Sequence, residues 1–436
     1  MLYNFAEYIH NHHEAAFRFV RVFTSYTMLV GIGTALAFFL SVFLLPKFWH
    51  LLPSDRGRIL AIGGDASKGK PTGAGLIFVF IAIFVMMLTV PLTFQSWYLW
   101  GLVFCMVLAM LSGYFDDASK IPWGEKPKLL MDIGIALLAA WVISCRPMEI
   151  DGAWHFTLIP QKMTIWAPFI KQVDHLGLLS HVPQGLMYVS DVNFDTLVAP
   201  GEPKTEIICL ILSPWLYIPM ATALLLLSIN ATNCSDGVDN LAGMLSLMAL
   251  VYLGIFLYAV VGHEEFSRYL LIPHHAGGPR WAIMIFCVIG ALCGYLWHNA
   301  FPSAVLMGDG GSRFLGLLIG ISVLLSQNPL MIFAVSPMIL VNGGTGLVKL
   351  LTLRMLRRLG FDTTPPHQIE EKRRVDPRYQ PPPQIVLVKA LHSVRFPLHD
   401  HFRKNKNWSP AQVVVRFLLI QALLTPLLFL LLVKLR

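Results

Sequence analysis

The feature that most constrains this chain is a series of long apolar runs that alternate with polar loops. A helix needs about 20 mostly apolar residues to cross the hydrocarbon core of a bilayer. That length predicts ten spans, at residues 22–45, 73–94, 96–114, 129–146, 208–229, 241–261, 281–298, 312–327, 329–353 and 411–433. The eighth span is short and is joined closely to the ninth, so a count of nine or eleven also fits the sequence.

Composition leads to the same class of protein. Only 13% of the residues are charged and 56% are hydrophobic, whereas about a quarter of a soluble globular protein is charged. The six cysteines stand singly, without a C-x-x-C pair, which indicates neither a disulfide framework nor a zinc site. No basic tract is interleaved with aromatic residues, so no nucleic-acid partner is expected. We predict an all-α polytopic membrane protein that forms a single transmembrane domain over residues 1–436.

The distribution of charge predicts the orientation in the membrane. With an even number of spans, one side of the membrane holds loops 46–72, 115–128, 230–240, 299–311 and 354–410. Lys and Arg gather in the first and last of these loops, so the positive-inside rule makes all five cytoplasmic. Residues 147–207 are predicted to be an exterior loop insertion with a small β-hairpin. Residues 354–410 are predicted to be a cytoplasmic loop that includes a Pro-rich, charged stretch.

Four polar clusters fall in these predicted cytoplasmic loops. Two adjacent aspartates begin the second loop, NCSDGVDN lies in the third, MGDGGS in the fourth and HDH in the fifth. The polar residues concerned are Asp116, Asp117, Asn233, Asp236, Asp239, Asp309, His399, Asp400 and His401. Each cluster alone also fits a helix cap, a turn or a solvated patch. Because all four are predicted on one face of the membrane, a common site is the favoured interpretation.

The chemistry that such a set of residues suits is phosphoryl transfer. Converging carboxylates repel one another and need a divalent cation, and magnesium prefers oxygen ligands. Glycines in MGDGGS would let backbone N–H groups approach phosphate oxygens. Lys120, Lys126 and Lys128 follow the paired aspartates and could neutralise charge on a diphosphate. No Walker loop is present in the sequence, so ATP is not implied.

These motifs resemble the polyprenyl-phosphate N-acetylhexosamine-1-phosphate transferase superfamily and, within it, the phospho-N-acetylmuramoyl-pentapeptide transferase (MraY) family. The stretch DDASK is similar to DDxxK, NCSDGVDNLA to NxxDGxDGLA, and MGDGGS to MGDTGS. PLHDHF, with VVVRF downstream, resembles the PLHHHFE stretch specific to the muramoyl enzymes. The resemblance covers most of the transmembrane chain.

The resemblance implies a specific reaction. Phospho-MurNAc-pentapeptide would pass from UDP-MurNAc-pentapeptide to undecaprenyl phosphate, with Mg²⁺ as cofactor, forming lipid I and releasing UMP in peptidoglycan synthesis. The enzyme would be a homodimer in the bacterial inner membrane, with its site facing the cytoplasm. Catalytic roles are implied for Asp116, Asp117, Asp309, His399 and His401, with Asp309 and Asp117 as metal ligands. Substrate binding is implied for Lys68, Lys70, Thr72, Lys120, Lys126, Lys128, Asn233, Asp236, Asp239 and Leu306.

The sequence also departs from the family pattern. Lys70 stands where threonine is usual, Asn240 replaces a glycine, Leu306 replaces a phenylalanine, and Asp400 replaces the middle histidine of three. A sister transferase that uses UDP-GlcNAc is the nearer alternative, and a transporter is the remote one. Direct attack on the diphosphate and a covalent aspartyl-phosphate route both stay open.

Overall fold

The computed structural model describes residues 1–13, 18–55, 57, 67–119, 121, 123–150, 153–155, 157–168, 185–193, 206–375, 380 and 383–434. Helices dominate these residues, as expected where lipid offers the backbone no hydrogen-bond partners. The long and medium helices are α1 (Leu2–His13), α2 (Tyr26–Phe48), α3 (Gly75–Thr89), α4 (Phe94–Ala118), α5 (Glu125–Ser144), α7 (Pro214–Ser235), α8 (Leu241–Ile255), α10 (Gly278–Asn299), α11 (Gly308–Leu325), α14 (Thr345–Arg358), α15 (Pro366–Val375) and α18 (Pro410–Lys434). The shorter ones are η1 (Arg18–Thr24), η2 (Trp49–Leu51), η4 (Phe256–Val261), α9 (Glu264–Tyr269), α12 (Met331–Val335), α13 (Pro337–Ile339), η5 (Leu340–Gly344), α16 (Val386–Ser393) and α17 (Leu398–Lys406).

The predicted all-α polytopic membrane fold is confirmed. Among the described residues, nine helical stretches are long and apolar enough to cross a membrane. They occupy nine of the ten predicted positions. The second predicted span, 73–94, contains only the 15-residue helix α3. The prediction of a full-length helix there is wrong because α3 ends at Thr89, and residues 90–93 are extended or irregular before α4 begins.

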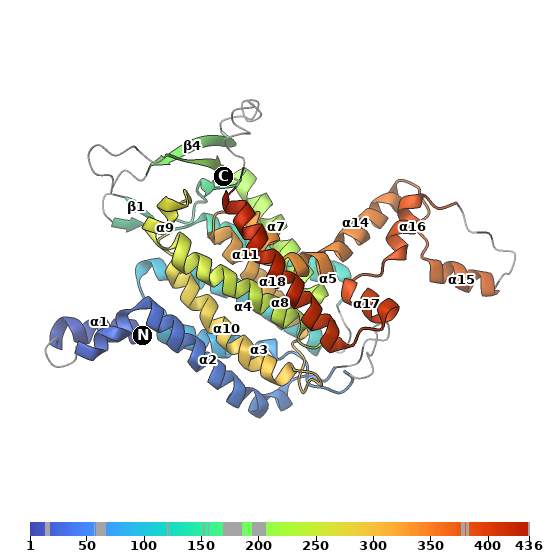
Figure 1. Ribbon diagram of the computed structural model, residues 1–436, viewed down its shortest axis with the longest axis horizontal. Helices are drawn as coiled ribbons and strands as arrows, with labels where there is room; N and C mark the ends of the chain where they lie inside the picture. Colours follow the sequence, from blue (N-terminus) through green and yellow to red (C-terminus); the bar gives the residue numbers. More distant parts are fainter. Residues whose placement is uncertain are drawn as a thin grey trace.

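Helix α11 lies at the centre of the bundle. Its apolar stretch is 89% buried, whereas those of α2 and α18 are 28% buried and form the lipid-facing periphery. It packs on α4, α7 and α3 (Figure 1). The residues that begin α11 therefore lie among the ends of several other helices, and these residues include Asp309.

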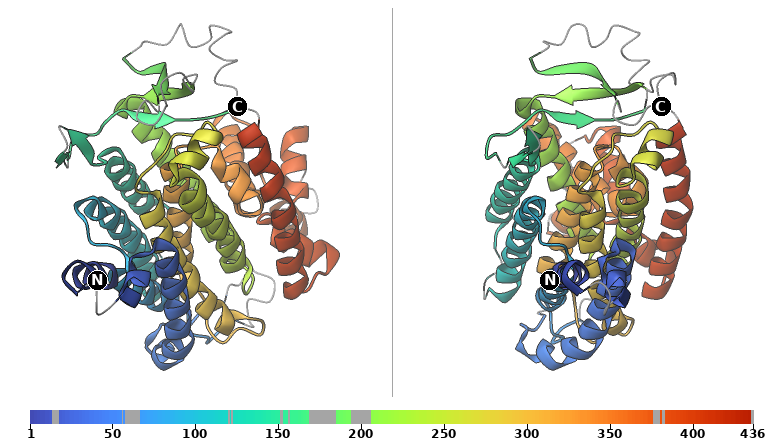
Figure 2. Two further views of the ribbon diagram at one scale, coloured as in Figure 1. Left: turned by 60° about the vertical axis from the view of Figure 1, so that its left-hand side comes forward. Right: turned by 90° about the vertical axis from the view of Figure 1, so that its left-hand side faces the viewer.

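Two small sheets lie at one end of the bundle, on the same side as the C-terminus (Figure 2). Strand β1 (Met148–Ile150) pairs with β2 (Ala153–His155) as an antiparallel hairpin. Strands β3 (Met163–Ile165) and β4 (Met187–Asn193) both pair antiparallel with β5 (Glu206–Leu212), in the order β3-β5-β4. The structure therefore has more strand here than the single hairpin that the sequence predicts. Residues 151–152, 156, 169–184 and 194–205 of the predicted insertion lie outside the described residues.

Helices α14, α15 and α16 extend away from the bundle, whereas α17 folds back against α18 (Figure 1). This path carries the HDH element, residues 399–401, back to the helix ends where the acidic loops lie. The long predicted loop 354–410 is therefore largely helical within its described residues.

Candidate active site

Three aspartates from two helices meet at one end of the bundle. Asp116 and Asp117 belong to the last turn of α4, and Asp309 belongs to the first turn of α11. One ligand atom from each of the three carboxylates lies within 4.8 Å of the others. The two clusters belong to separate loops of the sequence, and the packing of α4 on α11 brings them together.

The backbone at the start of α11 holds this arrangement. The backbone N–H of Asp309 donates a hydrogen bond of 2.8 Å to Oδ2 of Asp117. Gly308 has a φ of +75°, and a Cβ at this position would collide with the Asp117 carboxylate. Position 308 therefore requires glycine. The partial positive charge at the helix N-terminus also favours the two carboxylates that lie there.

Lys128, in the first turn of α5, links Asp116 of α4 to Asp309 of α11. Its ammonium forms an ion pair with Asp116 and lies 3.7 Å from Oδ2 of Asp309. Asp116 is buried, and its Oδ1 also accepts a 2.7 Å hydrogen bond from the backbone N–H of Trp123. Lys128 thus compensates part of the negative charge, and Asp116 is already occupied by two donors. Asp117 and Asp309 therefore have more carboxylate oxygens available to bind a cation than Asp116 has.

The aspartate-rich loop after α7 lies beside this cluster. The side-chain amide of Asn233 donates to Oγ of Ser312, one turn after Asp309 on α11. Asp236 follows the last turn of α7, and both Asp236 and Asp239 are partly exposed. The predicted grouping of these residues near Asp309 therefore agrees with the contact between α7 and α11.

His399 is the histidine that reaches this loop. A Cβ on Gly237 would overlap the His399 imidazole, so the ring packs directly against the backbone between Asp236 and Asp239. The ring is buried. The backbone N–H of His399 donates to Oδ1 of Asn342 at 3.0 Å, and the ring Nδ1 of His399 lies 3.1 Å from the same oxygen. Asn342 therefore fixes the orientation of the ring.

His401 and Asp400 lie differently. The His401 Nδ1 accepts a 3.2 Å hydrogen bond from the backbone N–H of Arg395, and the side chain of Asn405 also contacts the ring. This ring is held against its own segment of chain. The Oδ1 of Asp400 lies 3.8 Å from the Nε2 of His399. Of the two predicted catalytic histidines, the structure brings His399 to the aspartate-rich loop, and a ligand-facing role for His401 stays a prediction.

Three of the remaining predicted binding residues, Lys70, Thr72 and Leu306, lie close to the start of α11. Lys70 donates from Nζ to Oγ of Ser303 at 3.0 Å, Thr72 is buried, and the backbone of Leu306 bonds to Pro71. Those contacts place the 70–72 segment beside the start of α11. Lys68 and Lys126 are exposed. Lys120 lies outside the described residues.

Asn342 and Tyr114 are two residues of this region that the motifs of the sequence do not include. Asn342 lies inside the predicted ninth span, and its side chain is fully buried in η5. A polar amide within an apolar run is the signal that could have identified it. Tyr114 precedes Asp117 by one helical turn, and its ring packs on Gly73. An aromatic residue at the end of an apolar span gives no such signal.

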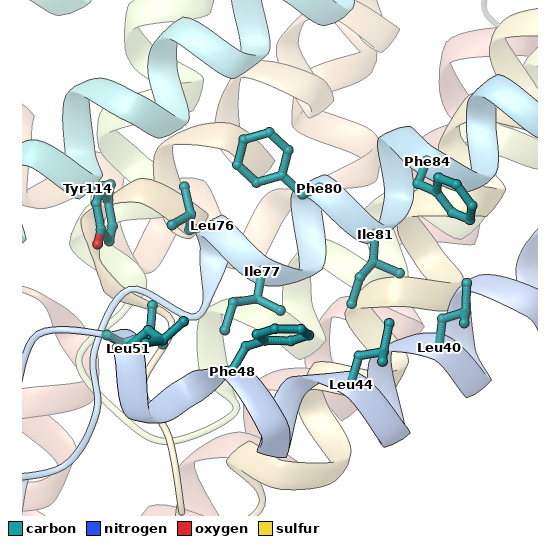
Figure 3. Close-up of a pocket in the computed structure, with 11 residues that line it drawn as sticks. Leu40, Leu44, Phe48, Leu51, Leu76, Ile77, Phe80, Ile81, Phe84 and Tyr114 are labelled. Carbon is teal, nitrogen blue, oxygen red and sulfur yellow. The ribbon is translucent and has the colours of Figure 1, made fainter.

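An apolar groove runs along α2 and α3 and reaches Tyr114 at one end (Figure 3). Tyr114 lies on α4, one turn before Asp117. Its volume is about 520 Å³, and its walls consist of Leu, Ile and Phe side chains with Tyr114 at one end. Phe80 and Phe84 on its wall are 52% and 55% exposed, so the groove opens toward the surrounding lipid. At the Tyr114 end of the groove, Gly73 lies between the Tyr114 ring and Gly308. Gly308 in turn lies against the Asp117 carboxylate.

Fold and site together define an integral-membrane transferase of the glycosyl-1-phosphate class. The model of Glycosyl transferase family 4 matches residues 99–327. The phospho-N-acetylmuramoyl-pentapeptide-transferase of Treponema pallidum is 37% identical over 406 residues, which are 93% of this chain and 90% of the relative. The enzymes of the same name from Sulfurimonas denitrificans and Helicobacter pylori are 26% and 27% identical over 97% and 93% of this chain, and over 97% and 94% of their own lengths. The chain belongs to the phospho-N-acetylmuramoyl-pentapeptide transferase family, as its motifs predict.

Proposed function

We propose that this enzyme transfers phospho-MurNAc-pentapeptide from UDP-MurNAc-pentapeptide to undecaprenyl phosphate, forming lipid I and releasing UMP. The observation that carries the proposal is the convergence of Asp116, Asp117, Asp309 and Lys128 at the ends of membrane-spanning helices. A site at a helix end is accessible both to a soluble nucleotide sugar and to a lipid phosphate. The positive-inside pattern supports placing that end at the cytoplasmic face of the bacterial inner membrane.

The carboxylates fit a magnesium ion. Three oxygen donors lie within 4.8 Å of one another, and Mg²⁺ takes oxygen ligands of which one or two are commonly carboxylates. Asp117 and Asp309 would hold the ion, since Asp116 is paired with Lys128. When bound, the ion would neutralise charge on the diphosphate.

The protein's own residues would act mainly by positioning and by charge compensation, as is general for phosphoryl transfer. In the direct route that we favour, an oxygen of the lipid phosphate attacks the sugar-linked phosphorus, and the bond from that phosphorus to the UMP oxygen breaks. The attacking oxygen is already anionic, so little base catalysis is required. Lys128 would compensate the charge on the transferred group. A covalent intermediate on Asp116 or Asp117 is the alternative route.

The loop between α7 and α8 is suited to the nucleotide. Carboxylates repel a diphosphate, so we propose that Asp236 or Asp239 accepts hydrogen bonds from uracil or ribose. Asn233, Lys70 and Thr72 would complete the donor site. The ring of His399 lies against this loop and would face the sugar and the phosphates.

The groove of Figure 3 supports a lipid acceptor. A chain of isoprene units is apolar and flexible, and the Leu, Ile and Phe walls between α2 and α3 match that chemistry. We propose that the groove takes part of the undecaprenyl chain, with its phosphate near Asp117. The homodimer that the family resemblance implies stays a prediction.

The test is a UMP-release assay of the purified protein in detergent with Mg²⁺ and undecaprenyl phosphate. UMP formed from UDP-MurNAc-pentapeptide and not from UDP-GlcNAc is the expected result. UMP formed from UDP-GlcNAc would assign the chain to the sister specificity. No UMP from either donor, in protein that is folded, would contradict transferase activity and favour the transporter alternative.

A further inference from the structure

A buried ion pair lies one helical turn from the aspartate cluster. Nη1 of Arg313 on α11 is 2.9 Å from Oδ1 of Asp132 on α5, and both side chains are only 4% exposed. The same guanidinium donates to Oγ of Ser112 on α4 at 3.3 Å. This pair therefore connects the three helices that carry the aspartates and Lys128.

Two charge pairs, one helical turn apart, lie between α5 and α11. Lys128 and Asp132 are four residues apart on α5, and Asp309 and Arg313 are four residues apart on α11. Residues four apart share one face of a helix, about 6 Å along its axis. In the first pair the positive charge, Lys128, is on α5 and faces Asp309. In the second pair the positive charge, Arg313, is on α11 and faces Asp132. A shift of α5 along α11 by one turn would place like charges opposite each other.

Stability alone does not account for a charged pair at this depth. Ionisable residues inside a membrane protein are costly and tend to mark functional positions. Replacing a buried pair with apolar residues of similar volume is often neutral or stabilising, because desolvation offsets the attraction. An apolar pair tolerates small displacements of one helix along another. An Arg–carboxylate contact is directional and therefore defines one alignment of the two helices.

We propose that Asp132 and Arg313 are positioning residues that set the alignment of α5 on α11 and so hold the Lys128 ammonium between Asp116 and Asp309. The inference rests on the proposed function of that cluster. If Lys128 is held there, its charge competes with a divalent cation for the same carboxylates. Loosening the alignment should therefore strengthen cation binding while it weakens catalysis. A pair that only stabilised the fold would not produce these opposite effects.

The test uses the double variant Asp132→Leu with Arg313→Met, which removes both charges and leaves neither partner buried alone. Arg313→Lys is the conservative variant, since its ammonium keeps the charge. Glu125→Gln is the matched control, because Glu125 lies on the same helix but its ion pair with Arg354 is exposed. Each variant is assayed for UMP release, for Mn²⁺ affinity by electron paramagnetic resonance and for thermal unfolding in detergent.

The double variant is expected to melt within a few degrees of the wild type, to turn over about tenfold more slowly and to bind Mn²⁺ about threefold more tightly. Arg313→Lys should keep most of the activity, and Glu125→Gln should match the wild type in all three measurements. Wild-type turnover and Mn²⁺ affinity in the double variant would overturn the inference. Slower turnover with unchanged Mn²⁺ affinity would also overturn it, since Lys128 would then not have moved. Wild-type protein that binds Mn²⁺ but releases no UMP would contradict the proposed function, and the Mn²⁺ comparison would still decide the positioning role.

Discussion

Asp309 is the residue whose replacement tests the site most directly. Its carboxylate lies at the N-terminus of α11, 3.7 Å from the Lys128 ammonium and within 4.8 Å of a ligand atom from each of Asp116 and Asp117. Asp309→Asn keeps the size of the side chain, removes its charge and replaces one carboxylate oxygen with an amide nitrogen. The backbone N–H that binds Asp117 is unaffected. The variant should therefore fold normally.

The expected loss of activity is large. Two unit charges about 4 Å apart interact by about 4 kcal/mol at an effective dielectric constant near 20. A divalent cation held at this distance by Asp309 would interact more strongly still. Loss of about 4 kcal/mol of transition-state stabilisation corresponds to a rate about 1,000-fold lower. We expect the Asp309→Asn enzyme to lose between about 100-fold and 1,000-fold in turnover, because the amide still offers one oxygen ligand.

The assay is UMP release under saturating substrates, with the Mg²⁺ concentration varied. Excess Mg²⁺ should restore part of the rate if the carboxylate acts through the ion. Glu265→Gln is the control, since Glu265 is an exposed carboxylate in α9, outside the proposed site. Turnover above about a tenth of the wild-type rate, at ordinary Mg²⁺ concentrations, would refute the assignment of Asp309 to the metal, since a metal contributes several kcal/mol.

Three further predictions concern the histidines and the groove. His399→Ala should lower turnover about 100-fold, because the His399 ring packs on Gly237 in the loop between α7 and α8, where we propose that the nucleotide binds. Asp400→His should change turnover only a few-fold, and equal effects of the two variants in the UMP assay would contradict this. Ile77→Trp should fill the groove and raise the KM for undecaprenyl phosphate about tenfold. The KM for a short-chain acceptor such as farnesyl phosphate should not change. Equal changes for both acceptors would show that the undecaprenyl chain binds elsewhere. Burial lowers the pKa of His275 to about 4, so its neutral form stabilises the fold fully above pH 6.5, and about 3 kcal/mol should be lost as the pH falls toward 4. Denaturant unfolding at several pH values checks this, and a His275→Gln variant with the same pH dependence would exclude the histidine.

The sequence predicted the membrane fold because long apolar runs leave few alternatives. Each predicted span contains an apolar helix, and only α3 is much shorter than its run of residues. Hydropathy cannot locate such a helix end, since residues 90–93 are as compatible with an apolar run as with a turn. The strands β3, β4 and β5 pair residues that are far apart in sequence. Local patterns therefore indicated strand but not the sheet.

The sequence also indicated that Asp116 and Asp117 would lie near Asp309, because the loops that carry them are predicted on one face of the membrane. It could not predict which charges pair. The contacts of Lys128 with Asp116 and Asp309, and of His399 with Asn342, depend on how helices distant in sequence pack together. The two histidines of HDH look equivalent in sequence, and only the fold of α17 distinguishes them.

The glycines of MGDGGS show how the interpretation changes once packing is known. The sequence alone suggested that they let backbone N–H groups approach phosphate. In the structure, a Cβ on Gly311 would press on Gly75 of α3, and a Cβ on Gly113 of α4 would lie 2.6 Å from the Asp309 carbonyl oxygen. Gly75 of α3 therefore faces Gly311 of α11, and Gly113 of α4 faces Gly310 of α11. The close approach of α3 and α4 to α11 requires glycine at these positions. Since the distance between Asp117 and Asp309 is set by that approach, these glycines help to determine the geometry of the carboxylates.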